Sequence, residues 1–183
     1  MKKYLELGLF VRTAILLLTL ILLSACDKDK PTCQGIDCLP PATQTGAGTF
    51  GCLVNGEPYV DNSGRFNCFY QLVNGKYYFG IQAEQSLSNI VLIGLGSNDK
   101  NIQENTLIQL NMDQPQNFYG GINIANLGGS IKTNNSADGI INFLKLDFQN
   151  KIVSATFEFT VTDPNTGTVY EITQGRFDTK FTQ

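Results

Sequence analysis

The sequence predicts an all-β protein, an antiparallel β-sandwich with a closed β-barrel as the alternative. Apolar and polar residues alternate in short runs, turn-forming residues separate the runs, and no run after Cys26 keeps a helical period. About ten to twelve short strands at this spacing are typical of sandwiches and barrels. The pairs Gly120-Gly121 and Gly128-Gly129 favour the sandwich, because glycine lets a strand bend or change sheets.

Two hairpins open the folded region. Asn55-Gly56 and Asn74-Gly75 are the dipeptides most typical of two-residue hairpin loops. The register around the second turn places Cys68 on the same face as Tyr70, so we expect Cys68 to point into the core. The strands that these turns join are predicted at Thr49–Val54, Glu57–Val60, 65–73 and Lys76–Glu84.

Further strands fill the rest of the chain. The clearest alternation is 153–163, where every second residue is apolar, so one face should meet the core and the other water. Pro164 follows in a turn, since its ring presets the backbone angle that turns need. The other strands are predicted at 90–95, 106–112, 119–124, 139–148, 168–173 and 176–181.

Residues 1–25 are predicted to form a cleaved signal peptide. The first twelve residues contain the basic residues Lys2, Lys3 and Arg12. An uncharged run rich in leucine and isoleucine follows at 13–23. As a helix that run would measure roughly 16 Å, about half the hydrocarbon thickness of a bilayer, so a transmembrane anchor is disfavoured. A basic start followed by a short apolar run and small residues is typical of secretion signals.

Cys26 is the predicted site of lipid attachment. Leu23-Ser24-Ala25-Cys26 resembles the lipobox of bacterial lipoproteins, in which the cysteine receives acyl chains such as palmitate and becomes the new N-terminus. The resemblance implies that a membrane is bound through this anchor, because several acyl chains together give stable attachment. The charged residues 27–30 are similar to the surface-export signal of Bacteroidota lipoproteins. That similarity implies an outer-membrane protein exposed at the cell surface, with periplasm-facing display as the alternative.

A linker separates Cys26 from the predicted domain. Residues 27–48 are rich in proline, threonine, glycine and glutamine and show no periodicity. We therefore expect 26–48 to be a lipidated, flexible tether and 49–183 to be the all-β domain.

Four further cysteines follow Cys26. An even number in an exported chain predicts disulfide bonds, with three possible pairings. We expect Cys33 to pair with Cys38 within the tether, and Cys52 with Cys68 across neighbouring elements. A four-thiolate zinc site is the alternative, although the paired C-x2-C spacing of such sites is missing.

The mature chain resembles a family of Bacteroidota lipoproteins that carries no established activity. The resemblance rests on LPPATQTG at 39–46, on TFGCLVNG at 49–56 and on the closing pattern over 152–159 and 172–178. It implies an all-β domain on a lipid anchor. The chain departs from the family at Ala155, where glycine is frequent.

Composition limits the function classes. The chain has 13 basic and 16 acidic residues and a net charge of −3, without a basic cluster, so no nucleic acid is expected as a partner. It has no histidine, which removes histidine-based triads and histidine-ligated metal sites. We expect no cofactor, and catalysis is disfavoured.

Several groups of residues are candidates for chemistry. Paired carboxylates are the machinery of glycoside hydrolysis, and the acidic residues of the last strands are Asp147, Glu158, Glu171 and Asp178. Scattered surface acids are the simpler interpretation. Asp178 with Arg176 is expected to form an exposed cross-strand charge pair.

Two further groups concern binding. The loop 98–104 offers oxygen ligands for calcium, although it lacks the EF-hand spacing. Tyrosines are common in strands, yet they can also line a sugar-binding face. The candidates are Tyr59, Tyr70, Tyr77, Tyr78 and Tyr119, of which Tyr78 is expected on the face opposite to Tyr77.

Three functions follow from these patterns. The first is a non-enzymatic, membrane-tethered module that binds an extracellular ligand or a partner protein. The second is a glycan-acting hydrolase that uses two carboxylates. The third is a carrier of small apolar molecules, which requires a barrel with an open interior.

Overall fold

β-Strands form nearly all of the regular structure. The computed structural model describes residues 33–85, 90–125, 129–134 and 139–183. The predictions for the signal peptide, for Cys26 and for residues 27–30 lie outside these residues. In the described part of the chain the only helix is the 3-10 helix η1 (Gly35–Cys38). The strands are β1 (Thr49–Val54), β2 (Glu57–Val60), β3 (Asn67–Val73), β4 (Lys76–Glu84), β5 (Ile90–Asn98), β6 (Leu107–Leu110), β7 (Asn117–Ile124), β8 (Ser130–Lys132), β9 (Gly139–Asp147), β10 (Ile152–Thr162) and β11 (Val169–Lys180).

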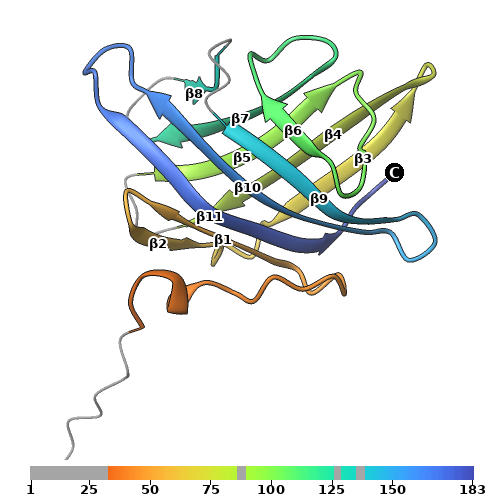
Figure 1. Ribbon diagram of the computed structural model, residues 1–183, viewed down its shortest axis with the longest axis horizontal. Coiled ribbons are helices and arrows are strands. Elements are labelled where there is room, and N and C mark those ends of the chain that lie inside the picture. Colours follow the sequence, from red (N-terminus) through yellow and green to blue (C-terminus); the bar gives the residue numbers. More distant parts are fainter. Residues whose placement is uncertain (1–32, 86–89, 126–128, 135–138) are drawn as a thin grey trace, which may run out of the picture. The chain divides into compact units, whose positions relative to one another are not determined.

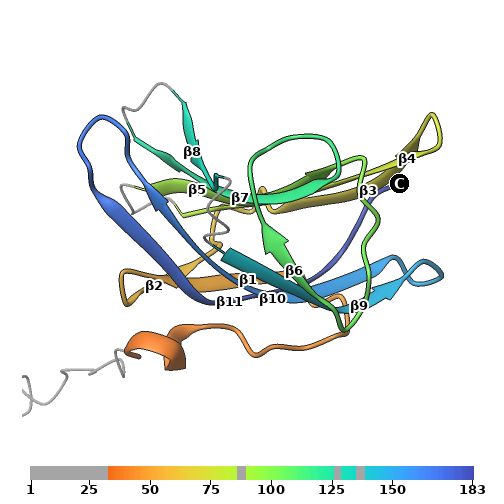
Figure 2. The same ribbon diagram turned by 45° about the horizontal axis from the view of Figure 1, so that its top comes forward.

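These strands belong to one mixed sheet. Its order is β2-β1-β11-β10-β9-β6-β7-β5-β4-β3, and β8 is added beside β7. The described neighbours pair antiparallel, except that β6 and β7 run parallel and meet at Leu110 and Phe118. The sheet curls strongly into a half-barrel (Figure 2). The all-β prediction is therefore confirmed, and the architecture lies between a sandwich and a closed barrel.

The curl places two layers face to face. Figures 1 and 2 show β1, β2, β9, β10 and β11 in one layer and β3, β4, β5 and β7 in the other. The chain after β11 ties the edge strand β3 to the first layer. Tyr70 N donates to Thr182 O at 2.9 Å, and Thr182 N donates to Cys68 O at 3.0 Å. A second tie joins Glu84 N to Asp61 Oδ1 at 2.8 Å. These bonds link the two layers at the open edges of the sheet, where no full ladder of strand pairing connects them.

Phenylalanine rings fill the space between the layers. Phe79 of β4 lies 5.4 Å from Phe143 of β9 and 6.2 Å from Phe177 of β11, measured between ring centroids. Phe50 of β1 lies 5.3 Å from Phe157 of β10. All five rings are buried. The interior is packed with side chains, which weighs against a carrier that holds its ligand inside.

The C-terminal strand differs from the prediction. The runs 168–173 and 176–181 were expected to be separate, but they form the continuous strand β11. Its register with β10 shifts next to Phe157, which lies opposite Gly175. Gln174 takes a positive φ of 53° at this point. The expected break is therefore a β-bulge inside one strand.

Residues 34–48 belong to the folded unit, which corrects the predicted tether. The unit spans Gln34–Gln183. We call residues 39–48 the strap, because they cross the outer face of the first layer (Figure 1). Leu39 is buried, and an added Cβ on Gly51 of β1 would lie 2.6 Å from Pro40 Cδ. Pro40 therefore packs directly on the backbone of β1.

Asp178 of β11 anchors the strap. Its side chain is buried and its carboxylate accepts hydrogen bonds from Thr43 Oγ1 at 2.6 Å, Thr45 N at 2.8 Å and Gly46 N at 2.7 Å. Burial raises the pKa of Asp178, but these hydrogen bonds lower it by more, so the pKa lies below its usual value. The predicted surface pair with Arg176 is wrong, since Arg176 Nε instead donates to Gln174 O at 3.1 Å.

The cysteines follow the expected pairing only in part. Cys33 and Cys38 are disulfide-bonded, as their spacing suggested. Cys52 and Cys68 both point into the core as predicted, yet they are free thiols rather than a disulfide. They lie on β1 and β3, which do not pair with each other in the sheet. Burial raises the pKa of both thiols, so they behave as small apolar side chains.

Candidate functional site

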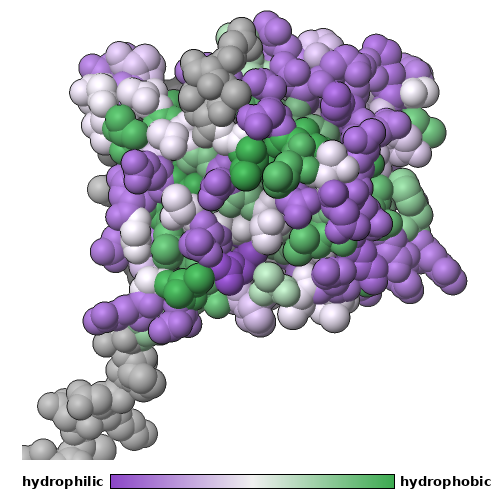
Figure 3. Space-filling view, in the orientation of Figure 1, coloured by the Kyte–Doolittle hydropathy of each residue, from purple (hydrophilic) through white to green (hydrophobic). Residues whose placement is uncertain are grey.

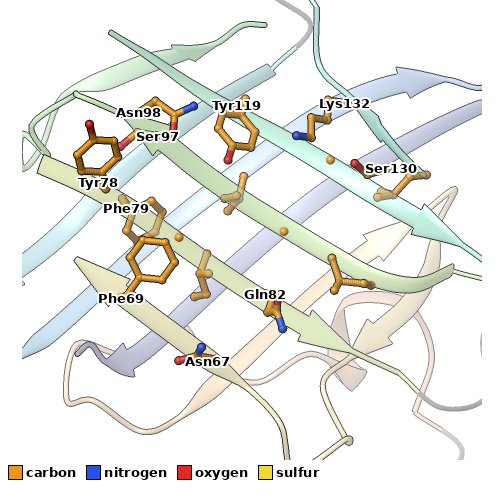
Figure 4. A pocket seen from close by; sticks show the side chains of 17 residues that line it. Asn67, Phe69, Tyr78, Phe79, Gln82, Ser97, Asn98, Tyr119, Ser130 and Lys132 are labelled. Carbon is orange, nitrogen blue, oxygen red and sulfur yellow. The ribbon is translucent and has the colours of Figure 1, made fainter. Parts of the chain in front are cut away.

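A groove of about 440 Å³ lies on the outer face of the second layer (Figure 4). The antiparallel strands β3, β4, β5 and β7 form its floor, and β8 closes one side. In these strands every second residue points away from the core, and the groove opens over these outward positions, although atoms of the buried residues Phe79, Ile81 and Ile122 also line it. The outward side chains and glycines that line it are Asn67, Phe69, Tyr78, Gly80, Gln82, Leu92, Gly94, Asn98, Tyr119, Gly121, Ser130 and Lys132.

The register of the sheet arranges these residues in rows across the strands. One row has an aromatic residue at each end and glycine between them. It runs Phe69, Gly80, Gly96, Tyr119. The next row has amides at one end and a lysine at the other. It runs Asn67, Gln82, Gly94, Gly121, Lys132.

Glycine at the centre of the first row allows the two aromatic rings to lie down on the sheet. A Cβ on Gly80 would come 2.4 Å from Phe69 Cε1, and one on Gly96 would come 2.6 Å from Tyr119 Oη. Figure 4 shows the rings of Phe69, Tyr78 and Tyr119 almost face on, viewed from outside the sheet. The rings of Phe69 and Tyr119 therefore each pack on a glycine of the neighbouring strand, and all three rings are partly exposed in the groove.

The polar groups of the groove fall into two kinds. The amides of Asn67 and Gln82 are exposed, and no hydrogen bond joins them to another described side chain. Asn98 and Lys132 are instead held by Asp113, from the loop between β6 and β7. Asn98 Nδ2 lies 2.5 Å from Asp113 Oδ1, and Lys132 Nζ lies 2.5 Å from Asp113 Oδ2. The groove thus combines two free amides with two fixed donors.

Charge in the groove is balanced. Lys132 is the one charged residue in its described lining, and it forms an ion pair with Asp113. The hydrogen bond with Asp113 raises the pKa of Lys132, so the ammonium stays protonated at neutral pH. Its Nζ lies 5.1 Å from the centroid of the Tyr119 ring, a cation–π contact. Burial and Asp113 raise the pKa of Tyr119, so its hydroxyl stays neutral.

The predicted carboxylates do not come together as one site. Asp178 is buried under the strap, and Asp147 accepts a hydrogen bond from Asn150 in the turn after β9. Glu158 and Glu171 are exposed on the outer face of the first layer. None of the four lines the groove. The structure gives no support to a hydrolase built on these residues.

That outer face of the first layer has two further hollows. They measure about 350 and 420 Å³ and share Ile140 and Glu158. Figure 3 shows the face as a mixture of hydrophilic and hydrophobic areas. The aromatic residues at these hollows, Phe157 and Phe159, are buried, so neither offers a ring face. For this reason we take the groove, not the hollows, as the candidate site.

The five candidate tyrosines separate into core and groove. Tyr59 is buried and its hydroxyl donates to Ala83 O at 3.0 Å. Tyr70 accepts a hydrogen bond from Ile102 N, and Tyr77 stacks on its ring at 4.7 Å between centroids. Only Tyr78 and Tyr119 line the groove. Tyr77 packs against the core whereas Tyr78 lines the groove, so the expectation that the two point to opposite faces is confirmed.

Phe69, Asn67, Gln82 and Lys132 were missed from the sequence. A detectable pattern was present in 92–98, where glycines at Gly94 and Gly96 occupy two successive outward positions of one strand. Glycine weakens a strand unless another group packs closely over it. That pattern indicates that other side chains or a ligand pack over the outward face of β5. It does not show which residues these are.

The other predicted ligand sites are not formed. Asp99 of the loop 98–104 pairs with Lys76 at 2.8 Å, and Glu104 accepts a hydrogen bond from Leu146 N. Among the described residues, no three histidine, cysteine or acidic side chains gather closely enough to hold a metal ion. The disulfide-bonded Cys33 and Cys38 cannot join a four-thiolate zinc site.

Comparison of the chain with protein-family models, with curated proteins and with solved structures finds no match. In the part of the chain that the structure describes, no helix has the length and apolar character needed to cross a bilayer. The groove is therefore interpreted from its own geometry.

Proposed function

We propose that this chain is a lipid-anchored outer-membrane binding module that holds an extracellular ligand in the groove without chemically changing it. One observation carries the proposal: three aromatic rings, two exposed amides and a balanced ion pair share one concave face. Ligand pockets commonly combine apolar walls with a few placed polar groups in a volume of about 300–1,000 Å³. The groove has that composition and falls in that range.

The anchor is the second part of the proposal, and it rests on the sequence alone. Acyl chains on Cys26 would hold the module at the outer membrane, with its groove exposed to the outside of the cell. Since the folded unit begins at Gln34, the segment between the anchor and the fold is residues 27–33. Replacement of Cys26 by alanine tests the anchor by radiolabelled palmitate incorporation and membrane fractionation. Protease treatment of intact cells distinguishes surface display from periplasm-facing display.

The binding site is tested on the mature chain carrying Cys26→Ser, which removes only the acylated residue. A mixed set of sugars, nucleosides, amino acids and short peptides is added to ¹⁵N-labelled protein, and amide shifts are followed by NMR. We expect shifts at the glycines of the floor, Gly80, Gly94 and Gly121. Shifts that gather instead around Glu158 and Ile140 would move the binding site to the other layer. A set that leaves every amide unchanged would remove the support for a small-molecule binding module.

A further inference from the structure

We propose that the ligand of the groove is a neutral saccharide, with sugar rings stacked on Phe69 and Tyr119 and hydroxyls bonded by Asn67 and Gln82. This inference rests on the proposed binding function and adds the ligand's chemical class to it. Four features of the groove support it: the ring faces, the free amides, the charge balance and the open shape.

The ring faces fit the apolar side of a sugar. A pyranose presents axial C–H groups on one face, and these pack on the electron-rich face of an aromatic ring. The ring of Phe69 reaches across to Gly80 of β4, and the ring of Tyr119 reaches across to Gly96 of β5. Since β4 and β5 are neighbours, the two rings lie over adjacent strands, which are about 4.8 Å apart. We call these two rings the platforms. Consecutive sugar rings of a chain can therefore meet both platforms.

The amides fit the hydroxyl edge of a sugar. Each amide offers an N–H donor and a carbonyl acceptor side by side, which matches a hydroxyl pair that must both donate and accept. Asn67 and Gln82 are cross-strand partners in the row next to Phe69 and Gly80. Their side chains therefore stand at the rim of the aromatic row. Gly94 and Gly121 continue that row and also line the groove.

The charge balance favours a neutral ligand. A phosphate or a uronic acid needs a cation that is not already paired. In the described lining the positive charge is that of Lys132 alone, and its ammonium is 2.5 Å from Asp113 Oδ2. An anionic ligand would have to displace that carboxylate. The remaining N–H groups of Lys132 are still able to donate to a sugar hydroxyl.

The open shape and the lack of an acid pair favour binding over cleavage. Glycoside hydrolysis requires two carboxylates on either side of the scissile bond. No carboxylate is part of the described lining of the groove. The groove lies across a sheet face, where the ends of a longer chain are free to continue beyond it.

The test uses the mature Cys26→Ser chain and four probes: cellotetraose, maltotetraose, mannotetraose and the anionic tetragalacturonate. Binding is measured by calorimetry and by ¹⁵N NMR. We expect at least one neutral tetrasaccharide to bind and to shift the amides of Gly80, Gly94 and Gly121, with tetragalacturonate binding at least tenfold more weakly. Equal or tighter binding of tetragalacturonate would overturn the neutral assignment.

Two variants locate the site. Phe69→Ala removes an aromatic ring on which a sugar would stack, and Gln82→Ala removes an exposed amide. Each substitution should lower the affinity for the tetrasaccharide at least fivefold. Phe148→Ala is the control, because Phe148 is an exposed phenylalanine that lies outside the groove. Since Gln82 is exposed, its variant keeps the test valid if Phe69→Ala fails to fold. Unchanged affinity in both groove variants would overturn the inference.

The outcome also separates this inference from the proposed function. If none of the neutral tetrasaccharides shifts the groove amides but a nucleoside or peptide of the mixed set does, the saccharide class is wrong and the binding function stands. If no compound of either set shifts them, both are overturned.

Discussion

Thr43 donates a 2.6 Å hydrogen bond to the carboxylate of Asp178, although the two lie 135 positions apart in the chain. Asp178 lies fully buried on β11, and the strap that covers it comes before the first strand. The same carboxylate accepts backbone N–H groups of Thr45 and Gly46. This relationship joins the N-terminal segment, where the chain leaves its predicted anchor, to the last strand of the fold.

We predict that Asp178→Ala lowers the free energy of unfolding by about 2–4 kcal/mol, because two partly buried N–H donors and one hydroxyl lose a charged acceptor. The measurement is urea unfolding of the mature Cys26→Ser chain. Asp37→Ala is the control, since Asp37 is an exposed acid of η1 and should change stability by less than about 0.5 kcal/mol. Equal stability of the two variants would mean that the strap contributes little.

The strap also predicts how stability depends on pH. The pKa of Asp178 is lowered in the folded state, since its hydrogen bonds outweigh the effect of burial. Its contribution is therefore complete above the unfolded pKa of about 4 and is lost as pH falls through the lower folded value. We expect the stability difference between the wild type and Asp178→Asn to be constant from pH 7 to 5 and to shrink below pH 4. A difference that grows in acid would contradict the lowered pKa.

Gly96→Ala tests the support under Tyr119. The new methyl group would meet Tyr119 Oη at 2.6 Å, so the tip of this ring must move while the backbone stays. We expect altered Tyr119 ring signals in ¹³C NMR and a loss of stability below about 1 kcal/mol. Gly129→Ala is the control, because a Cβ there meets no atom of the described residues within 4 Å. Unchanged Tyr119 signals in Gly96→Ala would show that the ring does not rest on this glycine.

The free thiols give a direct chemical test of the fold. Cys52 and Cys68 are free and buried, and burial raises the pKa of both, so neither should react with iodoacetamide in the native state at pH 8. In urea without a reductant we expect two alkylated cysteines per mature Cys26→Ser chain. Mass spectrometry counts them, and added reductant should raise the count to four by opening the Cys33–Cys38 disulfide. If no cysteine is alkylated in the denatured, unreduced chain, then Cys52 and Cys68 form a disulfide bond after all.

Local patterns were enough to predict most strands. The hairpins at Asn55-Gly56 and Asn74-Gly75 and the buried face of β10 follow from short-range turn chemistry and from alternation over a few residues. Closure of the sheet was not predictable in this way. It depends on Thr182 meeting Cys68 and Tyr70, residues that are distant in sequence and carry no shared pattern.

The groove was only partly predictable for the same reason. Tyr78 and Tyr119 were among the candidates, but alternation shows only which face a side chain takes within its own strand. The partners across the sheet depend on the register of four strands, which pairs Phe69 with Gly80 and Gly96 with Tyr119. A shift of one residue in any of these strands would turn its outward residues into the core.

The sequence by itself determined the all-β class, the hairpin turns and the inward direction of Cys52 and Cys68, because each depends on neighbours within a few residues. Only the tertiary structure decided that these thiols stay unpaired, that residues 34–48 fold onto Asp178, and that aromatic rings and amides share one groove. Each of those results depends on contacts between residues far apart in the chain. Such contacts are set by the register and curl of the whole sheet rather than by any one segment of it.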